Sequence, residues 1–194
     1  MKTYVVLFRG INVGGNNILP MKELTTILEE NNYQDIKTYI QSGNVVLRSQ
    51  KKPDTNIGSI IQSKFGFKPE VIALEESEFI TAINNNPFSS KEGKTIHFYF
   101  CKRSPKANAE KLKMLRSESE EYYIEGKVFY LHAPYGIGRS KLVANIESCL
   151  GVPATGRNLN TINKLLSMVN NNAYKTLVRT FTALRFAHAA ELDR

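Results

Sequence analysis

The glycine- and asparagine-rich segment at residues 10–17 is the part of the sequence best suited to holding a ligand. Its three glycines let a backbone approach a ligand closely and reach positive φ. Arg9 and Lys22 flank it, and Asn12 and Asn16 add neutral donors and acceptors. The free amides of a helix that begins after this segment would favour an anion by about 0.3–1 kcal/mol. The predicted ligand-binding residues of this segment are Arg9, Asn12, Gly14, Gly15, Asn16 and Lys22.

Two features weaken a phosphate-loop interpretation of this segment. It has neither the GK[ST] ending of a Walker loop nor a GxGxxG pattern. Pro20, at the expected helix start, also removes one of the amides that a phosphate would use. The alternative is a strained connection whose glycines serve only the turns.

Two further segments place basic residues at glycine-flanked helix starts. Arg139 and Lys141 follow two glycines, with Ser140 as the expected helix cap. Arg157 and Asn158 follow Gly156 in the same way. Cations in a first helical turn oppose the helix dipole, which suggests that they serve an anion. The alternative is that these side chains point into water.

Positive charge is concentrated in the second half of the chain. The formal net charge is +8, of which residues 1–82 contribute nothing, residues 83–172 contribute +6 and residues 173–194 contribute +2. Such a basic region can attract phosphates or another anionic surface. The alternative is a solvated surface that only aids solubility.

Several common chemistries find no support in the sequence. Cys101 and Cys149 are isolated, which argues against a disulfide framework or zinc site and fits a cytoplasmic protein. The three histidines form no metal-ligand pattern, and no GxSxG motif or acid–base pair is evident. We therefore expect no metal and no cofactor, and whether the protein is an enzyme stays open. No signal peptide or membrane span is expected.

Hydrophobic periodicity predicts two successive βαββαβ units, so the expected fold class is α+β with two tandem ferredoxin-like halves. The first half should have strands near residues 4–9, 36–40, 45–48 and 70–74, with helices after Pro20 and Pro53. After a short helix at 76–83, the second should have strands at 95–100, 122–124, 128–131 and 152–155, with helices at 105–116 and 140–150. Additional C-terminal helices should begin at Asn158 and within the tail. The expected domains are residues 1–82, 83–172 and a helical tail at 173–194.

Aromatic residues mark one face of the second sheet. Alternation along residues 95–101 and 127–132 predicts Phe98 and Phe129 beneath the helices and His97, Tyr99 and Tyr130 on the open face. Open-face aromatics stack bases in RNA-binding folds of this topology. The alternative is that this face packs against the first half, since each half has a sheet face to bury.

Four blocks of the sequence resemble a known family. These blocks are RGINVGGN at residues 9–16, TYIQSGNV at 38–45, GIGRSKL at 136–142 and TGRN at 155–158. They look like the signature blocks of a bacterial family catalogued as domain of unknown function 1697, and the resemblance covers about residues 1–170. It implies paired ferredoxin-like units and brings no activity, substrate or catalytic residue.

The leading functional hypothesis is a binding protein for a phosphate-bearing ligand, with nucleic acid as a candidate partner. It would use the residues named above in all three segments. The alternatives are an enzyme acting on a small anionic metabolite between the halves, and a structural homo-oligomer.

Overall fold

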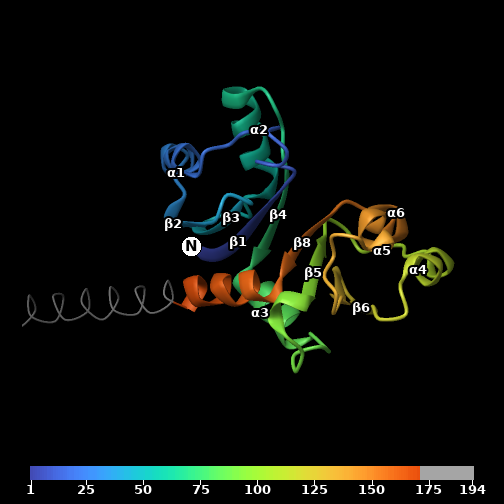
Figure 1. Cartoon of the computed structure of the whole chain (residues 1–194). Coiled ribbons are helices and arrows are strands. Elements are labelled where there is room, and N and C mark those ends of the chain that lie inside the picture. Colours follow the sequence, from blue (N-terminus) through green and yellow to red (C-terminus); the bar gives the residue numbers. More distant parts are fainter. Residues whose placement is uncertain (171–194) are drawn as a thin grey trace, which may run out of the picture.

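The computed structural model describes residues 1–170, so the predicted tail at 173–194 lies outside the described residues. The chain forms a mixed α/β fold with two four-stranded antiparallel sheets (Figure 1). No helix in the described part of the chain is both long and apolar enough to cross a membrane.

The first unit contains one sheet and two helices. Its elements are β1 (Lys2–Arg9), α1 (Met21–Glu30), β2 (Gln34–Tyr39), β3 (Asn44–Ser49), α2 (Asp54–Phe65) and β4 (Glu70–Glu75). The strands lie in the order β2-β3-β1-β4, with every neighbouring pair antiparallel. Leu24, Ile27 and Leu28 recur at helical spacing and are buried on the inner side of α1, which explains why this segment forms a helix.

The second unit follows a connecting helix, α3 (Glu76–Asn84). Its elements are a short 3₁₀ turn (Gly93–Thr95), β5 (Ile96–Cys101), α4 (Ala109–Leu115), β6 (Glu121–Glu125), β7 (Val128–His132), α5 (Lys141–Ala144), α6 (Ile146–Leu150) and β8 (Ala154–Asn158). The strand order is β6-β7-β5-β8, which repeats the order of the first unit. A further helix begins at residue 159 and continues to the end of the described residues.

The helix predicted at residues 140–150 is divided into α5 and α6. Asn145 lies at the break, and its side-chain amide donates to the Lys141 carbonyl at 2.9 Å. Asparagine side chains compete with the backbone for such carbonyls, which disfavours a continuous helix.

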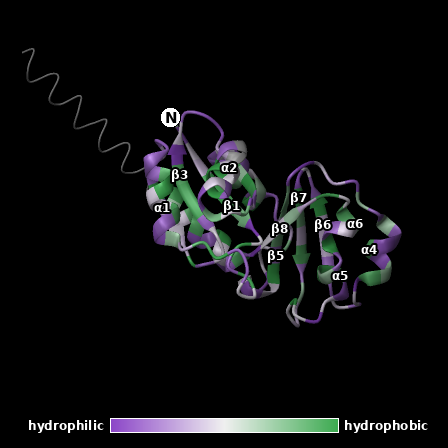
Figure 2. Ribbon diagram, turned by 90° about the horizontal axis from the view of Figure 1, so that it is seen from above, coloured by the Kyte–Doolittle hydropathy of each residue, from purple (hydrophilic) through white to green (hydrophobic). Residues whose placement is uncertain are grey.

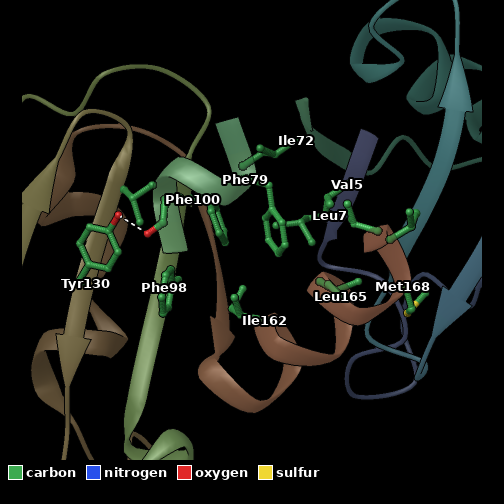
Figure 3. Close-up of a cluster of buried hydrophobic side chains, with 14 of the residues drawn as sticks. Val5, Leu7, Ile72, Phe79, Phe98, Phe100, Tyr130, Ile162, Leu165 and Met168 are labelled. Atoms are coloured by element: carbon green, nitrogen blue, oxygen red, sulfur yellow. Dashed lines mark hydrogen bonds between the residues drawn. The ribbon is translucent and has the colours of Figure 1, made fainter. Parts of the chain in front are cut away.

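Each sheet has helices on both faces. Figure 2 shows α1 and α2 on the first unit and α4, α5 and α6 at the far side of the second. The opposite faces of the two sheets meet α3 and the helix at 159–170, which lie together between the units (Figure 1). Figure 3 shows this central core, in which Phe79 and Ile162 separate Val5 of the first sheet from Phe98 of the second.

The predicted faces of the second sheet were right for β7, where Phe129 lies beneath the helices, but wrong for β5, where Phe98 and Tyr99 are exchanged. The strand register pairs Phe98 with Tyr130 and Tyr99 with Phe129, so each pair shares a face. Phe98 and Tyr130 belong to the central core, whereas Tyr99 and Phe129 pack beneath α4, α5 and α6. The alternative prediction, that the second face is covered by packing, agrees with the structure, although helices come between the sheets.

Tyr130 offers a test of this central core. Its ring is fully buried and its hydroxyl donates to the Ala82 carbonyl of α3 at 2.8 Å. Tyr130→Phe should lower the free energy of unfolding by about 1–2 kcal/mol, because a buried carbonyl loses its donor. Urea unfolding would measure this loss. Tyr123→Phe is the matched control, since that hydroxyl bonds Glu125 at the surface and should change stability by less than about 0.5 kcal/mol. Equal losses in both variants would contradict the prediction.

Candidate functional site

Arg157, on β8, joins the two units through buried hydrogen bonds. Its Nε donates to Asn44 Oδ1, and its Nη2 donates to the carbonyls of Phe8 at 2.8 Å and Ser42 at 2.9 Å. These three acceptors all belong to the first unit, on β1, in the turn before β3 and at the first residue of β3. Arg157 therefore fixes the β2–β3 turn of one unit against an edge strand of the other.

The Arg157 guanidinium is also a buried cation without a carboxylate partner in the described part of the chain. Its side chain is 9% exposed, and its Nη1 donates within β8 to Thr155 Oγ1 at 2.9 Å and to the Gly156 carbonyl at 2.7 Å. Every acceptor of the guanidinium is a neutral oxygen. Burial lowers the pKa of Arg157 to about 10, so the group stays protonated at neutral pH. Positive charge is thus held where the units meet.

Asn12 organises the glycine-rich segment that the sequence singled out. Its Nδ2 donates to the carbonyls of Leu19 at 2.9 Å and Gln41 at 2.8 Å, and its Oδ1 accepts from the Leu19 amide at 2.7 Å. Asn17 Nδ2 closes the segment by donating to the Gly10 carbonyl at 2.8 Å. Asn12 is thereby bound within the protein and fastens the segment to the β2–β3 turn.

The other predicted residues of the first unit are at the surface. Gly14, Gly15 and Asn16 are exposed, and Lys22 is exposed at the start of α1. Arg9 Nη2 forms an ion pair with Glu147 Oε2 of α6 at 2.5 Å. This pair crosses between the units and supplies Arg9 with a counter-charge.

Asn158 ends β8 and caps the helix that follows. Its Oδ1 accepts from the Thr161 amide at 2.9 Å, as the sequence predicted for a helix cap. That contact occupies the oxygen of Asn158. A ligand-binding role for Asn158, as for Arg157, stays a prediction.

The predicted site residues therefore divide into two groups. The segment at 10–17, the β2–β3 turn and the end of β8 come together where the units meet, and Arg157 and Asn12 connect them. Arg139 and Lys141 belong elsewhere, because they border a separate hollow.

This separate hollow, which we call the basic hollow, lies between the end of α4 and the loop before α5. It has a volume of about 770 Å³, and its charged lining residues are Arg116, Glu120, Arg139 and Lys141. Glu120 is buried and accepts from the Ser117 amide at 3.0 Å, so its carboxylate is bound within the protein. In the described part of the chain, none of the three cations has a carboxylate partner within 4.0 Å. Three cations against one carboxylate leave the lining positive.

Two large side chains at the basic hollow are unusually exposed. Tyr135 is 91% exposed and Met114 is 74% exposed, and both line the hollow. Their spacing in the sequence gave no signal, because α4 and the loop after β7 are brought together only by the fold. An exposed aromatic ring beside cations that have no carboxylate partner among residues 1–170 can stack on a base while the cations hold phosphate.

The two thiols are unsuited to nucleophilic chemistry. Both cysteines are buried and free. Burial, with a smaller effect from the Glu147 charge, raises the pKa of Cys101 to about 11, which keeps the thiol protonated at neutral pH. Among residues 1–170, no three His, Cys, Asp or Glu side chains gather to hold a metal ion.

Comparison with known proteins identifies the family. The model of a family described as protein of unknown function (DUF1697) matches residues 1–130. The chain belongs to this family. The DUF1697 match ends before the GIGRSKL and TGRN blocks. Both blocks were part of the resemblance described from the sequence.

One solved structure shows the same fold. It is that of the conserved bacterial protein SP0830 from Streptococcus pneumoniae, with 22% sequence identity and a TM-score of 0.61. The similarity covers 87% of this chain and 98% of that one. No curated protein matches the sequence.

Proposed function

We propose that this protein binds a phosphate-bearing ligand in the basic hollow, and that the ligand is single-stranded nucleic acid. The observation that carries the proposal is the meeting of Arg116, Arg139 and Lys141, none of them ion-paired within residues 1–170, beside the exposed ring of Tyr135. Phosphates would lie against the cations, and a base would stack on Tyr135. The net +6 of residues 83–172 would help the strand to approach.

The exposure of two hydrophobic side chains favours a nucleic-acid strand over inorganic phosphate as the ligand. Exposing Met114 and Tyr135 in one hollow leaves apolar surface in water, whereas a phosphate ion would cover neither side chain. Bases have an apolar π face that would cover both. Because stacking accepts every base, binding should show little sequence preference.

A binding titration with matched variants tests the proposal. A fluorescently labelled single-stranded oligonucleotide should bind the full chain at low salt, as measured by anisotropy. Tyr135→Ala should weaken binding by about 1–3 kcal/mol, which is roughly 5- to 150-fold, because a stacking partner is lost. Tyr135→Phe should bind like the natural protein, since its ring still stacks.

The salt dependence of binding tests the contribution of the cations. Arg139→Gln and Lys141→Gln should each reduce the slope of log K against log salt by about 0.7, because one phosphate contact is lost. Lys64→Gln, an exposed lysine of α2, is the control and should leave the slope unchanged. An absence of binding at low salt would refute the proposal, as would equal losses in all three lysine and arginine variants. A free nucleotide could also displace the labelled oligonucleotide as effectively as the unlabelled oligonucleotide does. That result would instead assign the hollow to a mononucleotide.

We make two further proposals, on the architecture of the units and on the location of the protein. We propose that residues 1–82 and 83–172 are tandem ferredoxin-like units, which the repeated strand order supports. We also propose a cytoplasmic location, in keeping with the two unpaired cysteines.

A further inference from the structure

A second cavity lies where the two units meet, and it is independent of the basic hollow. We call it the His97 cavity. It has a volume of about 400 Å³. Ser42 comes from the turn of the first unit, whereas His97, Tyr99, Ile137, Val143 and Thr161 come from the second. Arg157 also lines it. The cavity thus adjoins the hydrogen-bond network that joins the units.

His97 is a buried polar side chain that lacks a partner. It is 8% exposed, and its Nε2 has no hydrogen-bond partner among the described residues. Leaving a buried nitrogen unpaired costs about 1–3 kcal/mol, and native proteins rarely do so. Burial lowers the pKa of His97, so the imidazole is neutral at neutral pH. As a neutral ring it offers one N–H donor and one acceptor.

Arg157 gives the His97 cavity a positive charge. Its N–H groups already donate to neutral oxygens of the protein, so it acts on a ligand through its charge. A buried cation with no carboxylate partner favours an anion nearby, because the interaction is screened little by water. The cavity therefore combines a fixed positive charge with a donor that needs an acceptor.

The remaining lining sets the shape of the ligand. Ile137, Val143 and the ring of Tyr99 present apolar surface, and Thr161 presents a hydroxyl. Gly156 leaves room for the Tyr99 ring, since a Cβ at that position would lie 2.8 Å from Tyr99 Cε1. A hydrated inorganic ion would leave the apolar wall uncovered.

We propose that the His97 cavity binds a small organic carboxylate. Its carboxylate oxygens accept from His97 Nε2–H and from the Thr161 hydroxyl. Its apolar body packs against Ile137 and Val143. The positive charge of Arg157 favours the anion over a neutral molecule of the same shape.

Nuclear magnetic resonance of the full chain tests this with benzoate as the probe. In a long-range ¹H–¹⁵N spectrum of ¹⁵N-histidine protein, saturating benzoate should shift the Nε2 resonance of His97. Benzamide, which has the same shape without the charge, should bind at least roughly tenfold more weakly. The His132 resonances should stay in place, because its Nδ1 lies 3.2 Å from Glu121 Oε1, away from the cavity lining.

Three variants test whether benzoate lies in the His97 cavity. His97→Phe identifies the resonance and should abolish benzoate binding, and Val143→Phe should do so by filling the cavity. Lys141→Gln is the control and should leave benzoate binding unchanged, because Lys141 lines the basic hollow and is not among the residues that line the His97 cavity. If His97→Phe fails to fold, the spectrum of the natural protein still shows whether benzoate shifts a histidine resonance other than those of His132. Absence of a saturable His97 shift at millimolar benzoate would overturn the proposal, as would undiminished binding by Val143→Phe.

Discussion

Arg157→Met should lower the free energy of unfolding by about 3–5 kcal/mol, because several buried acceptors lose their donor at about 1–3 kcal/mol each. Methionine keeps most of the volume but none of the five N–H donors. The acceptors that lose their donor include Asn44 Oδ1 and the carbonyls of Phe8 and Ser42, which lie on the other unit. Unsatisfied buried acceptors retain their desolvation cost without a compensating hydrogen bond. Urea unfolding followed by circular dichroism measures the loss.

The conservative variant sharpens this prediction. Arg157→Lys should lose at least about 2 kcal/mol, because an ammonium group donates from one point and cannot reach acceptors on several segments. Arg103→Met is the matched control, since Arg103 is exposed, and it should change stability by less than about 0.5 kcal/mol. Wild-type stability in Arg157→Lys would show that charge alone, and not the fork of donors, joins the units.

The loss of Arg157 should also change how the protein unfolds. Each unit has its own outer core, and Arg157 is one of the contacts that hold the units together alongside the central core. We expect the urea transition of Arg157→Met to have a smaller m-value than that of the natural protein, because the units then unfold less cooperatively. A parallel shift of the curve with an unchanged m-value would show that the central core suffices for cooperativity.

Gly43→Ala should destabilise the protein by about 2–5 kcal/mol, the second large effect. Gly43 has φ of +73°, which costs an L-residue about 1–2 kcal/mol. An added Cβ would lie 2.6 Å from Phe8 Cβ and 2.6 Å from Ile11 Cδ1. Phe8 Cβ is attached to the central strand β1 and cannot move aside easily, so the clash adds about 1–3 kcal/mol.

Gly66→Ala separates the two causes of this loss. Gly66 has φ of +75° at the end of α2, and nothing lies within 4 Å of a Cβ at that position. It should therefore lose only the backbone contribution, about 1–2 kcal/mol. Thermal unfolding of both variants gives the difference. Equal losses would mean that the β2–β3 turn moves to accommodate the methyl group at little cost.

Local patterns in the sequence were enough to predict most of the elements. Alternating and helical hydrophobic spacing predicted the eight strands and the order in which helices separate them, because secondary structure depends largely on residues close in the chain. Four short blocks predicted the family, and the two around Gly10 and Gly43 lie within the residues that the family model matches.

Only the tertiary structure decided which atoms those residues contact. The acceptors of Arg157 in the first unit lie 113 to 149 positions away, so the sequence could not show whether the guanidinium faces a ligand or the other unit. The register of β5 against β7 likewise decided that Tyr99 lies under the helices, because a shift of one residue exchanges the two faces of a strand. Tyr135 and Arg116 meet in the basic hollow only because the fold brings α4 beside the loop after β7. Hydrogen bonding and desolvation act between atoms within a few ångströms, and that proximity is set by the folded chain and not by neighbours in sequence.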